Sequence, residues 1–207
     1  MRGELLPLFP LQTVLLPHAT LPLRIFEERY KEMIRELLPA RGEFGVVLAR
    51  DNGVLNTGCT AAVAQVLCEY EDGRIDLVAV GGRRFRLRDL NTDRSFLRGI
   101  VEEFDDDDFS EVNSTRLREA LALHRDYASA TGHDQDPPDA AAPELSFLLA
   151  DISPDLEFRQ LLLGTLSEAR RIELVANHLD QLLKQHGAQE SMRATARSNG
   201  HGKHWKE

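Results

Sequence analysis

The chain has 207 residues, of which 42% are hydrophobic, so it has enough apolar sequence to bury a core without disulfides or a structural metal. Its net charge of −9 argues against general attraction of the whole molecule to nucleic acid or to an anionic membrane. It has two cysteines, no signal-peptide pattern at its start and no stretch near the roughly 18 to 20 apolar residues of a membrane helix, which together predict a reduced, cytoplasmic protein.

The first thirty residues combine apolar side chains with prolines, in the runs 6–11, 14–18 and 21–27. Proline lacks the N–H group that a helix interior or a central strand must donate. This stretch is therefore predicted to form short extended segments at strand edges and strand starts. An unpaired edge beside apolar side chains can accept an unfolded peptide as an added strand, so this stretch is the first candidate for a binding site.

Local patterns predict a mostly β first half with one helix. Apolar residues recur at three- and four-residue steps over 27–38, which indicates a helix that ends near Pro39. The expected strands after it cover 44–49, 58–70, 74–80, 83–88 and 96–104, with turns at Asn52-Gly53 and Glu71-Asp72-Gly73. Gly81-Gly82 allows a bend or bulge, and an acidic tract, 105–108, closes this half.

The second half changes to helical spacing. Helices are expected over 112–130 and 143–149, after an N-cap at Ser153-Pro154, and after an N-cap at Ser167. Periodicity is lost after Gly187, which predicts a flexible tail. The predicted fold class is therefore α+β, with a β subdomain (1–108) that carries one or two helices, a small helical bundle (109–187) and the tail (188–207).

The order of these segments resembles a known family. Residues 6–11, then Leu16-Pro17-His18, Leu21-Pro22-Leu23 and residues 25–30, are similar to the opening of the Lon N-terminal domain, which precedes the ATPase in Lon proteases and also occurs as free-standing bacterial proteins. The blocks 44–48, 58–64 and 73–87 continue the similarity, which spans roughly residues 5–186. This resemblance implies a PUA-like pseudobarrel and a role in recognising polypeptide substrates.

The catalytic parts of a Lon protease have no counterpart in these residues. A phosphate-binding G-x-x-x-x-G-K-[ST] loop and a Ser-Lys pair are both missing, and the lysines are limited to Lys31, Lys184, Lys203 and Lys206. The Cys59 and Cys68 spacing does not suit a zinc site. We therefore expect a non-enzymatic protein with no catalytic residues, no metal and no cofactor.

Two surfaces are candidates for binding. The first would bind client or partner polypeptides through apolar residues that otherwise serve the core: Phe9, Leu15, Leu16, Leu21, Phe26 and Tyr30. The second is an arginine-rich strand, since residues 83–98 hold six arginines against two aspartates, a local charge of +4. Arg84, Arg86 and Arg88 would then face RNA phosphates, or they would simply pair with the acidic tract on a solvent-exposed strand. The sequence leaves the oligomeric state open.

Overall fold

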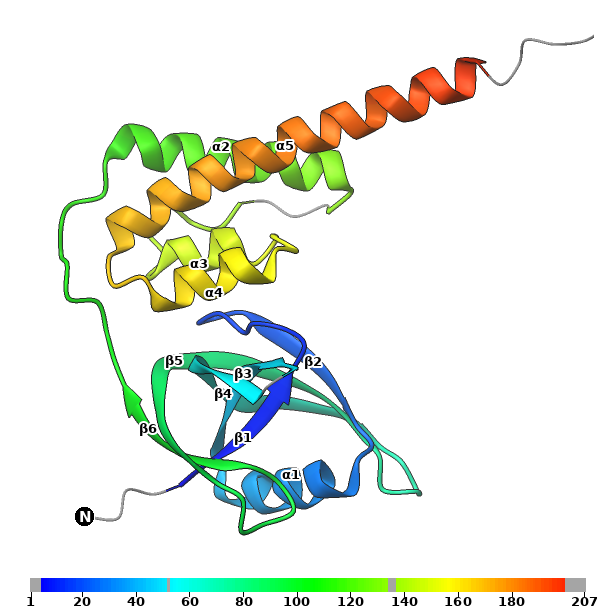
Figure 1. Ribbon diagram of the computed structural model, residues 1–207, viewed down its shortest axis with the longest axis vertical. Coiled ribbons are helices and arrows are strands. Elements are labelled where there is room, and N and C mark those ends of the chain that lie inside the picture. Colours follow the sequence, from blue (N-terminus) through cyan, green and yellow to red (C-terminus); the bar gives the residue numbers. More distant parts are fainter. Residues whose placement is uncertain (1–4, 52, 134–136, 200–207) are drawn as a thin grey trace, which may run out of the picture.

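The structure is a computed structural model of the chain, and it describes residues 5–51, 53–133 and 137–199. A twisted β unit and a helical unit lie one above the other in Figure 1, joined by a single extended segment after β6. The predicted α+β class is confirmed. The change in composition after the acidic tract coincides with this passage from strands to helices.

The β unit is a six-stranded sheet that closes on itself. Its strands are β1 (Leu6–Leu11), β2 (Thr20–Ile25), β3 (Glu43–Arg50), β4 (Gly53–Glu69), β5 (Ile75–Asn91) and β6 (Arg98–Glu103). The order is β2-β5-β4-β3-β1-β6, and β5 also pairs with β6. Because β5 and β4 are long, one half of β5 closes the barrel against β6 while its other half pairs with β2 outside the barrel.

The aromatic ring of Phe85 lies at the centre of a small apolar cluster inside the barrel. Phe85 is fully buried between Leu8 and Val47. A Cβ atom on Gly45 would lie 2.7 Å from Phe85 Cζ, and one on Gly58 would lie 2.5 Å from the same atom. These two glycines therefore make room for the ring, as small residues do where side chains must fill a narrow barrel.

Helix α1 (Glu28–Ala40) covers one side of the barrel and buries Met33 and Ile34. It begins where predicted and continues to Ala40, because Pro39 lies in the last turn and Arg41 adopts a left-handed conformation (φ 49°) that ends it. The Tyr30 ring packs against the Phe9 ring at a tilt of 33°, with ring centroids 4.1 Å apart. This helix thus joins the proline-rich stretch to the core.

The helical unit contains α2 (Ser114–Thr131), α3 (Leu145–Ala150), α4 (Leu156–Gly164) and α5 (Glu168–Asn199). Ser167 Oγ accepts a hydrogen bond from Arg170 N, as expected for the N-cap of α5. The expected cap of α4 at Ser153 is wrong, because the side chain of Asp155 accepts the hydrogen bond from Phe158 N. Asp155 takes this role because the helix starts two residues later than Pro154 suggests.

Helix α5 is longer than the sequence pattern predicts. It continues past Gly187 to Asn199 and projects away from the body of the molecule (Figure 1). A single glycine inside a helix costs only about 1 kcal/mol, and the residues after it include several good helix formers. The loss of the apolar stripe therefore marks the end of packing, not the end of the helix. The part of the expected tail at 200–207 lies outside the described residues.

The β and helical units meet at a buried cluster of charges, which we call the junction: Arg84 (β5), Asp106, Glu168 and Arg171 (α5). Arg171 is completely buried and donates to both Asp106 carboxylate oxygens, at 2.6 and 2.7 Å. Arg84 Nη2 donates to Asp106 Oδ1 at 2.6 Å, and Arg171 also reaches Glu168 at 2.7 Å. Two positive and two negative groups thus satisfy one another where the two units touch.

Candidate functional site

The structure places most of the apolar residues first considered for peptide binding in the core. Phe9, Leu15, Leu16 and Tyr30 are at most 6% exposed. Their side chains belong to the main hydrophobic core, so they cannot contact a ligand, and the assignment of these four residues to a binding surface is corrected accordingly. The apolar side chains of the proline-rich stretch thus mainly complete the hydrophobic core and do not form a binding surface.

The two remaining residues of that set lie nearer to solvent. Leu21 is half-buried and packs against the main core, while Phe26 is 62% exposed just beyond the end of β2. Phe26 is therefore available for binding, and Leu21 contributes at most an edge of its side chain. Both flank a different surface, formed by the solvent-facing side of β2 and its neighbours.

This surface belongs to a three-stranded extension of the barrel, which we call the arm: β2, residues 75–80 of β5 and residues 63–69 of β4. Directly opposite residues of antiparallel strands share a face of the sheet. Leu23 lies opposite buried Leu77 and so faces the core, whereas Pro22 lies opposite half-buried Val78 and faces solvent. The outer face of the arm therefore carries apolar side chains.

A shallow groove of about 390 Å³ lies at the arm, and residues of both faces of the sheet border it. Its lining is Pro22, Leu23, Arg24, Leu67, Asp76 and Leu77. In β4, Val66 pairs with Leu77 and Cys68 pairs with Asp76, so Leu67 between them has no partner in the ladder. Because β4 bulges at this point, the Leu67 side chain is 56% exposed. Simple alternation along β4 could not have assigned Leu67 to this groove.

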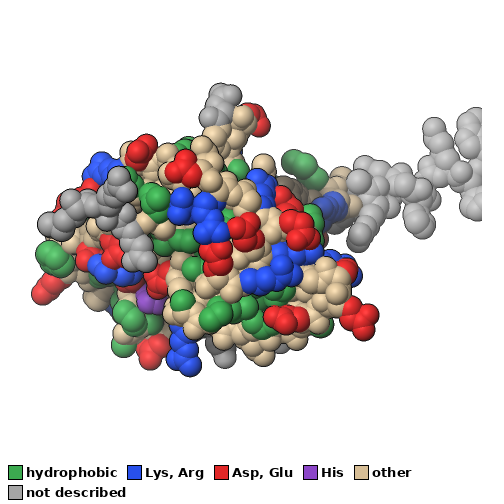
Figure 2. Space-filling model, turned by 90° about the horizontal axis from the view of Figure 1, so that it is seen from below, with side chains coloured by type: hydrophobic (Ala, Val, Ile, Leu, Met, Phe, Trp, Pro, Cys, Tyr) green, Lys and Arg blue, Asp and Glu red, His purple; other side chains and the backbone are tan. Residues whose placement is uncertain are grey.

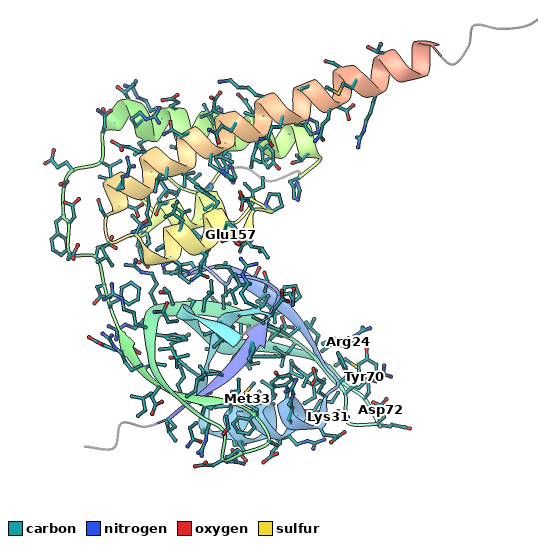
Figure 3. The ribbon with its side chains drawn as sticks, in the orientation of Figure 1. Arg24, Lys31, Met33, Tyr70, Asp72 and Glu157 are labelled. Carbon is teal, nitrogen blue, oxygen red and sulfur yellow. The ribbon has the colours of Figure 1, made fainter. Side chains whose placement is uncertain are left out.

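The charged groups of the groove are paired with each other. Arg24 donates two hydrogen bonds of 2.9 Å to the two oxygens of Asp76, and the Tyr70 hydroxyl donates a third, also of 2.9 Å. The hydrogen bond from Arg24 lowers the pKa of Asp76, and the bond to Asp76 raises the pKa of Tyr70. Figure 3 shows Arg24 and Tyr70 close together at the hairpin end of the arm. The groove therefore presents apolar contacts beside a neutral ion pair.

The hairpin end of the arm is braced by α1. Lys31 is only 6% exposed, and its Nζ donates to the backbone oxygen of Asp72 at 3.1 Å and to Glu28 at 2.8 Å. Figure 3 shows Lys31 at the end of α1 nearest to Asp72. This contact fixes the β4–β5 turn against the body of the protein, so the groove is held on an ordered scaffold.

The arginine-rich strand does not present its three residues on one exposed face. Arg84 is 3% exposed and belongs to the junction, which corrects its assignment to a nucleic-acid surface. Arg86 is half-buried with its guanidinium 4.7 Å from the Phe104 ring centroid, and Arg88 Nε donates to Glu102 at 2.7 Å. Seen from the α1 side, Figure 2 shows basic and acidic side chains interspersed, not separated into fields of one sign.

A second hollow, of about 550 Å³, surrounds the first residues of β1 between the end of α1 and β6. Its walls carry Glu36 paired with Arg94 and Glu103 paired with Arg83, alongside apolar residues such as Phe96. With so many ionic groups in its walls, it is less suited to an apolar segment than the groove of the arm.

Reactive and metal-binding chemistry is weakly represented. Cys59 and Cys68 are free thiols, and burial raises the pKa of Cys59 to about 12, which keeps it protonated. Within residues 5–51, 53–133 and 137–199, no cluster of three or more His, Cys, Asp or Glu side chains is arranged to hold a metal ion. In the same ranges, no helix is long and apolar enough to cross a membrane.

Comparison with known proteins gives consistent matches. The model of the ATP-dependent protease La (LON) substrate-binding domain matches residues 5–181. The crystal structure of a Lon N-terminal domain protein from Xanthomonas campestris shares 31% identity, with a TM-score of 0.65 over 87% of this chain and 98% of that one. The N-terminal domain of a Mycobacterium avium complex Lon protease, 16% identical, has a similar fold, with a TM-score of 0.57 over 86% of this chain and 98% of that one.

One curated relative shows how much of a Lon protease is represented. The Lon protease of Parabacteroides distasonis is 28% identical over 113 residues, which cover 50% of this chain and 14% of that protein. The chain thus spans a small part of that relative, and the family model that matches it describes a substrate-binding domain, not a protease or ATPase domain.

Proposed function

On the premise that the chain belongs to the family of ATP-dependent protease La (LON) substrate-binding domains, we propose that it is a non-enzymatic module that binds exposed segments of client or partner polypeptides. The observation that carries this proposal is the groove of the arm, where Pro22 and Leu67 offer apolar contact area on an ordered sheet. Clustered exposed apolar side chains are typical of protein-binding surfaces.

The surroundings of the groove support this function further. Phe26, which is 62% exposed, extends the apolar surface just beyond the end of β2. The free thiols Cys59 and Cys68 support a location in the reducing cytoplasm. The closed β sheet also supports the PUA-like description that the family resemblance implies.

The contacts of the arginine-rich strand lend less support to RNA binding. Arg84 serves the junction, and Arg88 is paired with Glu102, so that strand has little free positive charge to offer phosphates. Polypeptide binding is therefore the function that the geometry favours.

The test is a fluorescence anisotropy titration with a labelled, permanently unfolded protein, such as reduced and carboxymethylated α-lactalbumin. Leu67→Gln should weaken binding about fivefold to thirtyfold, because a leucine side chain buried in a complex contributes on the order of 1 to 2 kcal/mol. The matched control is Leu161→Gln on α4, since Leu161 is 55% exposed, almost as much as Leu67. Equal weakening by both variants, or no binding by the wild type, would contradict the proposal.

A further inference from the structure

The outer edge of β2 has a defined hydrogen-bonding phase. Gly81 N donates to Ala19 O at 2.9 Å, so this pair faces inward toward β5. Bonding alternates along an antiparallel pair, so Leu21 and Leu23 also bond toward β5. The backbone groups of Thr20, Pro22 and Arg24 consequently point to the outer edge, where the described part of the chain provides no further strand.

Pro22 stands at the centre of that edge. Its nitrogen carries no hydrogen, and its ring occupies the place through which an added strand would approach. The two remaining outward N–H groups, on Thr20 and Arg24, are four residues apart, which is about 13 Å along a strand. A peptide could therefore not form a continuous ladder along β2.

The opposite edge of the arm is interrupted in another way. The pairing of β3 with β4 stops at Glu43 and Ala62, so residues 63–69 of β4 form an outer edge within the described chain. Their pairing with β5 shifts register between Val63 and Gln65 and again between Val66 and Cys68. Bulges bend and twist an edge strand, which prevents a straight peptide from pairing with it.

The side chains of the arm lead to the complementary conclusion. The charges of Arg24 and Asp76 are satisfied by each other, so a charged client group would gain no free partner in the groove. Leu67, released from the ladder by its bulge, extends into solvent beside Pro22. The surface therefore complements uncharged apolar side chains.

We infer that the arm recognises its clients by their apolar side chains and not by strand addition, so that it accepts uncharged apolar segments whose backbone cannot form β-ladders. This inference rests on the proposed function. It replaces the expectation that an unpaired edge in the proline-rich stretch captures peptides as an added strand. It also enlarges the class of clients to segments that contain proline.

Four labelled peptides test the inference, each titrated against the full chain by fluorescence anisotropy. The parent alternates leucine and serine and has uncharged ends. Two variants are N-methylated at every leucine or at every serine, which removes the donors along one edge of the peptide and then along the other. In the fourth, glutamine replaces every leucine. We expect both methylated peptides to bind within about threefold of the parent and the glutamine peptide to lose at least about tenfold.

The outcomes separate the two proposals. If the parent binds and Leu67→Gln weakens it, but one methylated peptide loses more than about tenfold, recognition is by strand addition and the inference is overturned while the proposed function stands. If neither the parent peptide nor the unfolded protein binds the wild type, the proposed function and the inference fall together. The Leu161→Gln variant should bind all four peptides as the wild type does.

Discussion

The arm and the junction each contain an arginine that grips an aspartate with two hydrogen bonds, but solvent reaches them to very different extents. In the arm, Arg24 holds Asp76 with an arginine side chain that is 64% exposed. In the junction, Arg171 holds Asp106 with a side chain that is completely buried. The same chemical pair thus serves two purposes.

The difference follows from solvation. In water the attraction of an exposed ion pair is screened, so the pair in the arm adds little stability and mainly keeps the groove neutral. In the junction, burial alone would raise the pKa of Asp106, but hydrogen bonds from Arg171 and Arg84 outweigh it and lower that pKa. Removing one member there leaves a charge without its partner inside the protein.

The largest effect is expected from breaking the buried pair. Arg171→Met should reduce the free energy of unfolding by about 3 to 5 kcal/mol, because Glu168 loses its arginine and Asp106 keeps only Arg84 as a charged partner in the interior. The matched change in the arm, Arg24→Met, should cost less than about 1 kcal/mol. Urea unfolding followed by circular dichroism measures both.

The comparison would fail if the two variants lost similar stability. Binding provides a second readout, since folded Arg171→Met protein should still bind the unfolded-protein probe, its groove being built from other residues. Binding is measured without denaturant, at a temperature where the variant is fully folded. A loss of binding under these conditions would show that the arm and the junction are coupled.

Sequence patterns were informative about the elements because periodicity is a local property. The helix after the prolines, the β4–β5 hairpin and the helical second half all follow from apolar spacing and turn residues. The family resemblance added the expectation of a barrel, which local patterns do not contain, because closure depends on β5 pairing with both β2 and β6.

The candidate site was harder to predict, for two physical reasons. Burial depends on long-range packing, so the conspicuous Phe9 and Tyr30 proved to be core residues in contact with each other. Leu67 is exposed because of a bulge, which depends on register with the neighbouring strand. Arg84 likewise looked like part of a solvent-facing stripe, and only the fold brings Asp106 and Arg171 to it.

A smaller effect, confined to the helical unit, is expected from pH. Burial lowers the pKa of His124 and of His178, although Asp155 partly opposes this at His178. The unfolded chain therefore binds protons more readily than the folded one below about pH 6.5. The stability that these two neutral imidazoles contribute should be fully present above about pH 6.5. It should decrease as the pH falls from there toward their lower pKa values in the folded state.

Thermal unfolding between about pH 7.5 and 5.5 measures this slope, above the range in which carboxylates titrate. The double variant His124→Gln/His178→Gln should have a flatter profile than the wild type. An unchanged slope in the double variant would show that other groups carry the pH dependence. Probe binding by the arm should not change over the same range in protein that remains folded.

The smallest effect is expected on the arginine-rich strand, where the neutrality of the surface can be tested directly. Arg88→Gln removes an exposed guanidinium that is already paired with Glu102, so it should leave RNA retention at low ionic strength and its salt dependence unchanged. A filter-binding assay with a single-stranded RNA across a salt series makes the measurement. If the wild type is retained with a steep salt slope and Arg88→Gln reduces that slope by about one phosphate contact, the strand binds nucleic acid despite its pairing. The molecule would then carry a third, basic region besides the exposed ion pair of the arm and the buried ion pairs of the junction.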